Sequence, residues 1–332
     1  MKSHEYDFAL ADLPELFGWP LAPVVLFAAA MHLGASLNVL PSPRPTLDID
    51  RTILLHQAQA SRSRHAADVL FIGDSSCLMD VSAKQLAASL PRKHQVLNLG
   101  TLSYLDLPAY ARLLQAYVAA NPGRLRTVVL LMHPEALRRA SPTEYHVALL
   151  HSFYAATDLR DPASSMLVSC LGGDIFKARL LSRALPLPLT GNYGRRYGFT
   201  HDLWQYLSEN NGSAVDPGQF DRRSASGNAE YRLSPKLELA SQAFKAAVPA
   251  GVKLYVGITP APESFVMPNY RQQNSEMLRE WSQWLGADGV LEKLPAILPD
   301  DLFASTTHLN ERGARLYADL LAHMLSGYLP QR

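Results

Sequence analysis

The segment that most constrains the fold is residues 67–80, which read ADVLFIGDSSCLMD. Its apolar run, Val69–Ile72, is typical of a strand buried on both faces, and the run stops at Gly73. An acid and hydroxyl side chains follow directly. Open α/β sheets place their chemistry at the carboxyl ends of the strands. The pattern therefore predicts a parallel sheet with a functional site at the end of this first strand.

Strand and helix patterns alternate along the rest of the chain, which predicts a parallel sheet covered by helices on both faces. Further strands are expected at 95–99, 127–132, 252–258 and 289–291, and helices at 82–90, from 106 onward, at 235–248, 269–285 and 308–326. Residues 136–234 lack this alternation and are expected to form an insertion after the third strand. The insertion could be a cap that shapes the substrate cleft, or it could be a loop without a role, and the sequence leaves both interpretations open.

Residues 19–40 form the most apolar window of the chain. About 20 such residues suffice to span a bilayer, and the prolines that follow would stop a helix. The sequence thus predicts an N-terminal tail over 1–18, a transmembrane helix over 19–40, a linker and stalk over 41–66, and a domain over 67–328. The alternative for 19–40 is a buried helix of a soluble protein. The flanking charges leave the membrane orientation open.

Composition narrows the function classes. The chain has 332 residues, of which 48% are hydrophobic and 18% charged, and its formal net charge is +1. These values are typical of a globular protein and give no electrostatic reason to expect a nucleic-acid partner. Cys77 and Cys170 do not have metal-ligand spacing, so neither a metal nor another cofactor is expected. Whether the two cysteines pair is open.

Two side chains stand out as candidates for nucleophilic catalysis. Ser75 lies at the end of the first predicted strand, and a serine hydroxyl needs a neighbouring base to become a nucleophile near neutral pH. His308 lies at the start of the last predicted helix, and an imidazole titrates close to that pH. We therefore expect Ser75 and His308 to act as nucleophile and base.

Both motifs resemble blocks of the SGNH (GDSL) hydrolase superfamily. Gly73–Ser75 resembles the first block, whose Ser is the nucleophile, and His308–Asn310 resembles the last. The resemblance covers about residues 67–328 and implies a flavodoxin-like three-layer fold. It also implies that the backbone N–H groups of Ser75 and Gly100 stabilise the oxyanion and that Asp74 has a structural role.

The chain departs from the family pattern at two places. The family places an Asp three residues before the His, and this chain has Ser305 there. Asp300 or Asp301 could supply the missing carboxylate, or Ser305 or a backbone carbonyl could hold the imidazole. The block after the third strand normally supplies an Asn, and this chain has none there. His133 could donate in its place or could simply cap a helix.

These departures, together with the apolar N-terminal segment, resemble the envelope-associated branch of the superfamily, such as the alginate O-acetylation proteins and the D-alanyl-teichoic-acid protein. That resemblance implies an O-acyltransferase, with acetyl as the expected group, that modifies a cell-surface or secreted polysaccharide. It further implies a place in the bacterial inner membrane with a periplasmic catalytic domain, beside a membrane-bound O-acyltransferase as partner. The alternatives are a carbohydrate or lipid esterase and a catalytically inactive scaffold subunit of a polysaccharide secretion complex.

Overall fold

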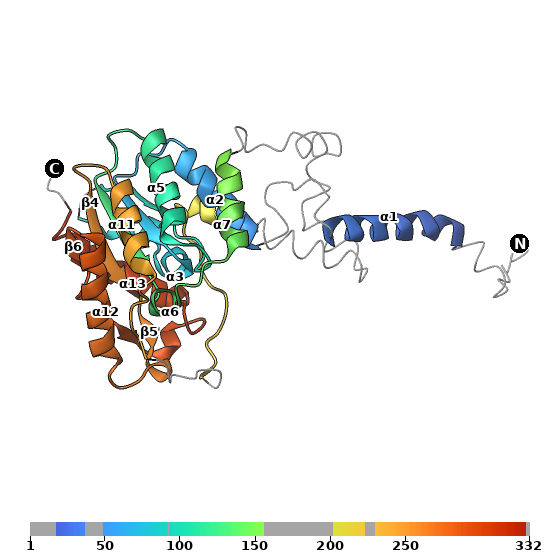
Figure 1. The fold of residues 1–332 in the computed structure, drawn as a ribbon. Coiled ribbons are helices and arrows are strands. Elements are labelled where there is room, and N and C mark those ends of the chain that lie inside the picture. Colours follow the sequence, from blue (N-terminus) through green and yellow to red (C-terminus); the bar gives the residue numbers. More distant parts are fainter. Residues whose placement is uncertain (1–17, 37–48, 92, 156–201, 223–229, 330–332) are drawn as a thin grey trace, which may run out of the picture. The chain divides into compact units, whose positions relative to one another are not determined.

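The computed structural model describes residues 18–36, 49–91, 93–155, 202–222 and 230–329 (Figure 1). The chain divides into two compact units, one made of residues 1–52 and 160–202 and the other of residues 53–159 and 203–332. Helix α1 (Trp19–Ser36) belongs to the first unit. The sheet and both sequence motifs belong to the second.

Helix α1 covers most of the predicted transmembrane segment. Within the described part of the chain, no helix combines the length and the apolar character that crossing a bilayer requires. The structure therefore gives no support to the predicted spanning helix over 19–40. Residues 1–17 of the predicted tail and residues 37–40 lie outside the described residues.

The second unit contains a five-stranded parallel sheet in the order β2-β1-β3-β4-β6. Its strands are β1 (Val69–Gly73), β2 (Val96–Asn98), β3 (Thr127–Met132), β4 (Lys253–Ile258) and β6 (Gly289–Val290). The predicted parallel sheet is thus confirmed, and its order is that of flavodoxin-like doubly wound sheets. The winding reverses between β1 and β3, where such sheets form their clefts. A second, two-stranded sheet pairs β5 (Ala261–Pro262) with β7 (Ile297–Leu298).

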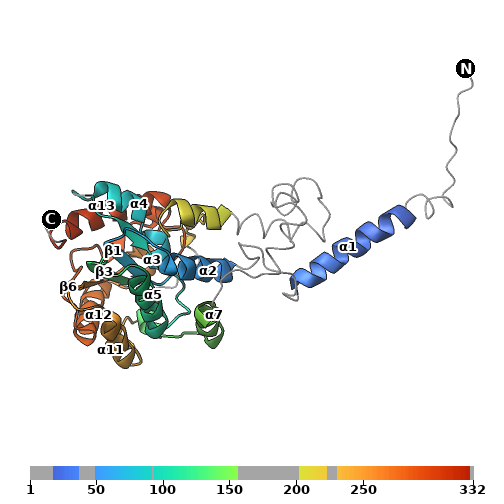
Figure 2. The ribbon, with the colours of Figure 1, turned by 90° about the horizontal axis from the view of Figure 1, so that it is seen from above.

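Helices cover both faces of the large sheet, so this unit has three layers (Figure 2). One face carries α5 (Leu107–Ala120), α11 (Leu237–Ala247) and α12 (Tyr270–Leu285), and α11 packs against both of the others. The other carries α4 (Ala83–Ser89) and α13 (Glu311–Leu325), which also pack together. Short 3-10 helices span Glu263–Phe265 and Asp300–Leu302.

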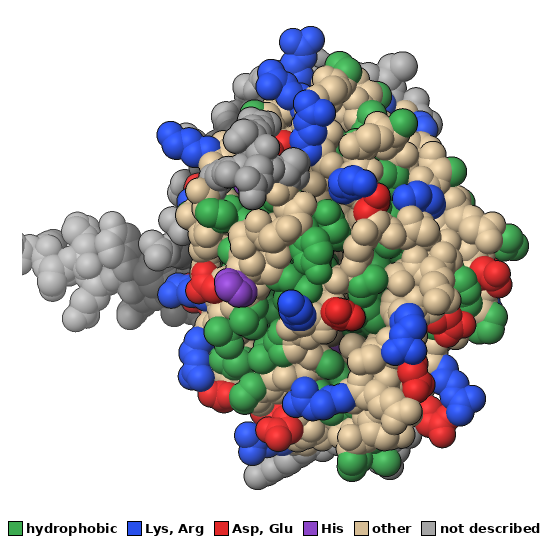
Figure 3. Space-filling model, turned by 90° about the vertical axis from the view of Figure 1, so that its left-hand side faces the viewer, with side chains coloured by type: hydrophobic (Ala, Val, Ile, Leu, Met, Phe, Trp, Pro, Cys, Tyr) green, Lys and Arg blue, Asp and Glu red, His purple; other side chains and the backbone are tan. Residues whose placement is uncertain are grey.

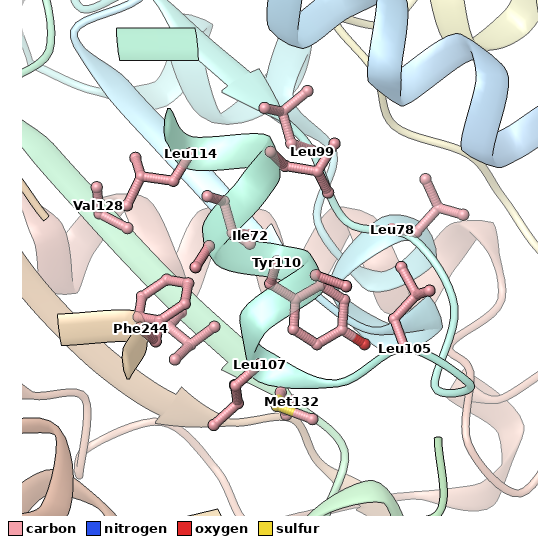
Figure 4. Close-up of a cluster of buried hydrophobic side chains, with 14 of the residues drawn as sticks. Ile72, Leu78, Leu99, Leu105, Leu107, Tyr110, Leu114, Val128, Met132 and Phe244 are labelled. Atoms are coloured by element: carbon pink, nitrogen blue, oxygen red, sulfur yellow. The ribbon is translucent and has the colours of Figure 1, made fainter. Parts of the chain in front are cut away.

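Strand β1 lies at the centre of both hydrophobic clusters. Leu70 and Ile72 belong to the cluster beneath α5 and α11, whereas Val69 and Phe71 belong to the cluster beneath α4 and α13. Figure 4 shows the first cluster around Tyr110. Because both faces of β1 are buried, its apolar run is continuous rather than alternating. Burying each such side chain contributes about 1.5–3 kcal/mol.

Helix α2 (Ile49–Arg62) was not expected from the sequence. From Ile53 onward it belongs to the second unit, so the predicted linker and stalk over 41–66 is wrong for these residues. Several of its buried side chains are polar, so the apolar periodicity that usually marks a packed helix is weak here. Gln57, for example, is fully buried and donates to the carbonyl oxygens of Gly100 (2.7 Å) and Gly212 (2.9 Å).

The predicted insertion over 136–234 is described only in part. Helices α6 (Pro134–Arg139) and α7 (Glu144–Ala155) lie at its start, and residues 203–209 are helical. Residues 156–201, with Cys170 among them, and 223–229 lie outside the described residues. The bounds of the insertion stay a prediction.

Charges of both signs are interspersed on the face of the molecule in Figure 3. Among the described residues, Lys253 of β4 pairs with Asp288, with 2.9 Å between Nζ and Oδ1. Such exposed pairs contribute little stability.

The side chain of Asn98, at the end of β2, fastens together the segments that surround the first motif. It is fully buried, and its Nδ2 donates to the carbonyl oxygens of Cys77 (2.8 Å) and Val81 (3.1 Å) and to Oγ of Ser213 (3.3 Å). Its Oδ1 accepts from the N–H of Gly100 at 2.7 Å. One amide thus joins helix α3 (Ser75–Asp80), the loop after β2 and the segment around residue 213.

We expect Asn98→Ala to lower the free energy of unfolding by about 2–4 kcal/mol, because buried groups that lose their partners each cost about 1–3 kcal/mol. Denaturant unfolding measures this loss. Asn269→Ala is the control, since Asn269 is exposed and makes no side-chain capping bond at the start of α12. A loss at Asn98 no larger than at Asn269 would contradict this role.

Candidate active site

Ser75 is the first residue of α3 and lies at the carboxyl edge of the sheet. Strand β1 ends at Gly73, where a Cβ would lie 1.7 Å from the carbonyl oxygen of Leu131. Only glycine lets β1 and β3 approach so closely at this point. Ser75 itself is partly exposed, while its neighbours Asp74 and Ser76 are fully buried. The local structure therefore presents one hydroxyl of the motif to the outside.

Asp74 holds this turn in place. Its carboxylate accepts from the N–H (3.1 Å) and the hydroxyl (2.6 Å) of Ser76, and from the N–H of His133 (2.9 Å). Burial raises the pKa of Asp74, and these hydrogen bonds act in the opposite direction. The contacts are those of an N-cap and of a bridge between β1 and β3. They agree with the structural role expected for Asp74.

The structure brings His308 next to Ser75. Nε2 of His308 lies 2.9 Å from Oγ of Ser75, although the two residues are 233 positions apart. The helix predicted from His308 begins instead at Glu311, with Asn310 as its N-cap, so His308 lies in the preceding turn.

Backbone contacts on both sides hold His308 in that turn. Oγ of Ser305 accepts from the N–H of His308 at 3.1 Å, and Oδ1 of the buried Asp80 accepts from the N–H of Leu309 at 2.7 Å. Ser305 therefore has the structural contact expected of it. These hydrogen bonds hold the backbone on which the imidazole stands.

The acid beside His308 is Asp216. Oδ2 of Asp216 lies 2.8 Å from Nδ1 of His308, and the two side chains are 20% and 16% exposed. Ser75, His308 and Asp216 thus form a continuous chain of hydrogen bonds of the kind found in catalytic triads. The partial exposure leaves the chain open to a substrate.

The expectation that Asp300 or Asp301 orients the imidazole is wrong. Asp300 is buried, and its oxygens bind Nε of Arg222 (2.8 Å) and the N–H of Ser264 (3.0 Å). Asp301 points outward, and its carboxylate pairs with Arg312 at 2.8 Å. Both carboxylates already have cationic partners away from the imidazole.

Asp216 reaches His308 because its segment packs along the edge of the sheet. The N–H of Asn98 in β2 donates to the carbonyl oxygen of Asn211 at 2.9 Å. Gly212 follows with a φ of +83°, and a Cβ there would lie 2.0 Å from the carbonyl oxygen of Asn98. The N–H of Ala214 then donates to the carbonyl oxygen of Leu78 at 3.0 Å. These contacts carry the chain from β2 across α3 to the site.

The local turn and the imidazole together keep Asp216 ionised. The hydrogen bond with His308 is the main cause that lowers the pKa of Asp216, and the N–H of Gly218, the charge of His308 and the hydroxyl of Ser305 act in the same direction against partial burial. An ionised Asp216 accepts the Nδ1–H of His308. The lone pair of Nε2 then faces the hydroxyl of Ser75.

Little in the sequence indicates that Asp216 is the acid beside His308. Residues 216–218 read Asp-Pro-Gly, a turn pattern in which Asp is common for local reasons, and Oδ1 of Asp216 does accept from the N–H of Gly218 at 2.8 Å. No spacing relates it to His308, which lies 92 positions later.

Gly100 does not have the predicted role of oxyanion donor. Its N–H donates to Oδ1 of Asn98 at 2.7 Å and so points into the interior. A glycine is required there for another reason, because a Cβ would lie 2.4 Å from the backbone N of Leu78. The N–H of Ser75 is not among the donors to Asp74, and its predicted role as oxyanion donor stays a prediction.

A cavity of about 320 Å³ opens beside Ser75. Most of the residues that line it have polar side chains, among them Ser103, Tyr104, His133, Glu135, Arg139, Ser141, Thr306 and Thr307, while Ala136 and Phe265 add apolar surface. Tyr104 is 47% exposed and stacks on His146, with 5.0 Å between the ring centroids. The structure thus brings Ser75, His308 and His133 together at one edge of the sheet.

Compared with known proteins, the chain matches no protein-family model and no curated protein.

We expect Asp216→Asn to lower kcat for an activated acetyl ester by about 10³–10⁴-fold, because the imidazole loses the carboxylate that fixes its tautomer. Steady-state kinetics measure this loss. Asp300→Asn and Asp301→Asn are matched controls on the neighbouring loop and should keep kcat within a few-fold of the wild type. A larger loss in either control than in Asp216→Asn would refute the assignment.

Proposed function

We propose that this protein is a serine acyl-transfer enzyme in which Ser75 carries the acyl group. The observation that supports this most is the chain of hydrogen bonds from Asp216 through His308 to Ser75, with distances of 2.8 and 2.9 Å. A base within hydrogen-bonding reach of a hydroxyl, oriented by a third group, is the arrangement that activates a serine.

In the first half-reaction, Oγ of Ser75 attacks the acyl carbon of the donor while Nε2 of His308 takes the hydroxyl proton. The tetrahedral intermediate collapses, the bond to the leaving group breaks, and His308 returns the proton to that group. An ester now joins the acyl group to Ser75. Asp216 stays ionised and stabilises the positive imidazolium while it exists.

In the second half-reaction, His308 takes the proton of an acceptor hydroxyl, whose oxygen attacks the acyl carbon. The bond between the acyl carbon and Oγ of Ser75 then breaks, and His308 returns the proton to Oγ. We propose a polysaccharide hydroxyl as acceptor and acetyl as the transferred group. The polar side chains among the residues that line the cavity and the exposed ring of Tyr104 at its wall support a polyhydroxylated acceptor. Water in the same place would make the protein an esterase, which is the second candidate.

The third interpretation, an inactive scaffold subunit, rested on the missing carboxylate and the missing Asn. Asp216 supplies a carboxylate at the required atom of the imidazole. The missing carboxylate is therefore no longer a reason to expect an inactive domain, and an enzyme is favoured.

The place of the chain in the SGNH superfamily and its resemblance to the envelope-associated branch stay predictions. The same holds for the inner-membrane location, the periplasmic position of the catalytic domain and the membrane-bound O-acyltransferase partner. The proposal of a Ser75-dependent acyl transfer does not depend on them.

A fluorophosphonate probe tests the nucleophile. We expect it to label the wild type on Ser75 and to leave Ser75→Ala unlabelled, since only an activated serine reacts quickly with such a probe. Ser103→Ala is the control, because Ser103 lines the same cavity, whereas the hydroxyl next to Nε2 of His308 is that of Ser75. Equal labelling of Ser75→Ala and the wild type would rule out Ser75 as the nucleophile.

Product analysis then tests the acceptor. With an activated acetyl ester and an oligosaccharide, we expect O-acetylated oligosaccharide that forms with the wild type and not with Ser75→Ala. Acetate as the sole product across a range of oligosaccharides would favour the esterase over the transferase.

A further inference from the structure

A second cavity, of about 340 Å³, lies at the edge of the large sheet that β2 forms. Its walls come from α2, the loop 63–67, β2 with the residue before it, and the helix of residues 203–209 with the turn that follows. None of these lining residues also lines the cavity beside Ser75. The volume lies within the range of about 300–1,000 Å³ that is usual for small-molecule sites. The proposed acyl transfer makes no use of this β2-edge cavity.

Hydrogen bonds and a ring contact hold the walls of the β2-edge cavity in place. Nε2 of His56 lies 3.2 Å from Oγ of Ser208, and that hydroxyl donates to the carbonyl oxygen of Trp204 at 2.9 Å. The rings of His56 and Trp204 meet edge to face, with 4.9 Å between their centroids. In the loop 63–67, the N–H of His65 donates to Oδ1 of Asn121 at 2.7 Å. The cavity is therefore formed before any ligand enters it.

The lining of this cavity carries no charge near neutral pH. The described residues that line it include no Asp, Glu, Lys or Arg. Burial lowers the pKa of both of its histidines, to about 4 for His56, so both imidazoles are neutral. A phosphate, a carboxylate or an organic cation would lose its hydration here without meeting an opposite charge. The lining therefore selects an uncharged ligand.

Polar and apolar groups are mixed in the lining. Hydroxyl, amide and imidazole groups offer donors and acceptors, while side chains such as Trp204 and Leu207 offer apolar surface. A purely apolar ligand would leave the polar groups without partners. A sugar ring suits both kinds of surface, because its C–H groups pack on an aromatic ring while its hydroxyls donate and accept hydrogen bonds.

The two histidines do not by themselves indicate a metal site. Among the described residues, no group of three His, Cys, Asp or Glu side chains is placed to hold a metal ion. The chemistry of the lining thus favours a neutral, polyhydroxylated ligand.

We propose that the β2-edge cavity is a second, non-catalytic binding site for an uncharged sugar unit. Asn211 lines this cavity, and five residues later Asp216 contacts His308. Five residues of chain span at most about 18 Å, so the two sites lie within reach of one polymer. A polysaccharide bound here keeps its other units near Ser75 and raises their effective concentration there. This use of the site rests on the proposed acyl transfer, whereas the binding of sugar does not.

Isothermal titration calorimetry of the full chain tests the site. The probes are oligosaccharides of glucose, mannose and N-acetylglucosamine, and an oligogalacturonate is the charged comparison. We expect an uncharged probe to bind, and its affinity to fall at least about tenfold in Trp204→Ala, because the aromatic ring is lost. Tyr206→Ala is the matched control and should bind as the wild type does. Tyr206 is 40% exposed on the same helix and is not among the residues that line the cavity.

A second variant fills the cavity instead of removing one of its walls. Ala66 is exposed and lines the cavity, so Ala66→Trp should block it without deleting any of the contacts above. We expect this variant to lose the same binding. Tyr104→Ala, in the cavity beside Ser75, should keep it. Thermal unfolding of each variant shows whether the fold is intact.

Three results would overturn the inference. The first is that no uncharged probe binds. The second is binding that Tyr104→Ala abolishes and that Ala66→Trp leaves intact, since this would place the sugar beside Ser75. The third is an oligogalacturonate that binds as tightly as the uncharged probes and is equally sensitive to Ala66→Trp. If Ser75→Ala keeps its esterase activity while the binding stays sensitive to Ala66→Trp, the proposed function fails and the sugar site stands.

Discussion

The hydrogen bond between Asp216 and His308, 2.8 Å long, is the contact on which the candidate site depends. It fixes the imidazole so that Nε2 accepts from Ser75, and it supplies the carboxylate that the SGNH-like last block lacks. The bond forms because residues 211–214 are fastened to β2 and α3 through Asn98, Leu78 and Gly212. In the family that the chain resembles, the carboxylate lies three residues before the His. Here Asp216, from a distant part of the chain, contacts the imidazole instead.

Around this bond, buried polar side chains do most of the positioning. Asp74 joins the start of α3 to His133 after β3, and Asn98 joins the other end of α3 to the segment that carries Asp216. Such groups are costly to bury unless they are fully bonded, and then they favour one arrangement over others.

The sequence was sufficient for features that follow from local periodicity. The five strands of the large sheet and the helices between them follow from apolar runs, and Ser75 and His308 stand in recognisable motifs. Helix α2 could not be predicted because Gln57 and other polar side chains on it are buried, which weakens its apolar periodicity. Asp216 and the inward N–H of Gly100 could not be predicted, since both depend on contacts between segments far apart in the chain.

The proposed reaction requires a covalent acyl-enzyme at Ser75 that forms with the help of His308 and Asp216. Mixing the protein with an excess of an activated acetyl ester, stopping the reaction in acid within the first turnover and mapping its peptides by mass spectrometry tests this most directly. We expect one acetyl group on Ser75, formed far more slowly in Asp216→Asn. An acetyl group on another residue, or acetylation of Ser75 at the same rate in Asp216→Asn, would contradict it.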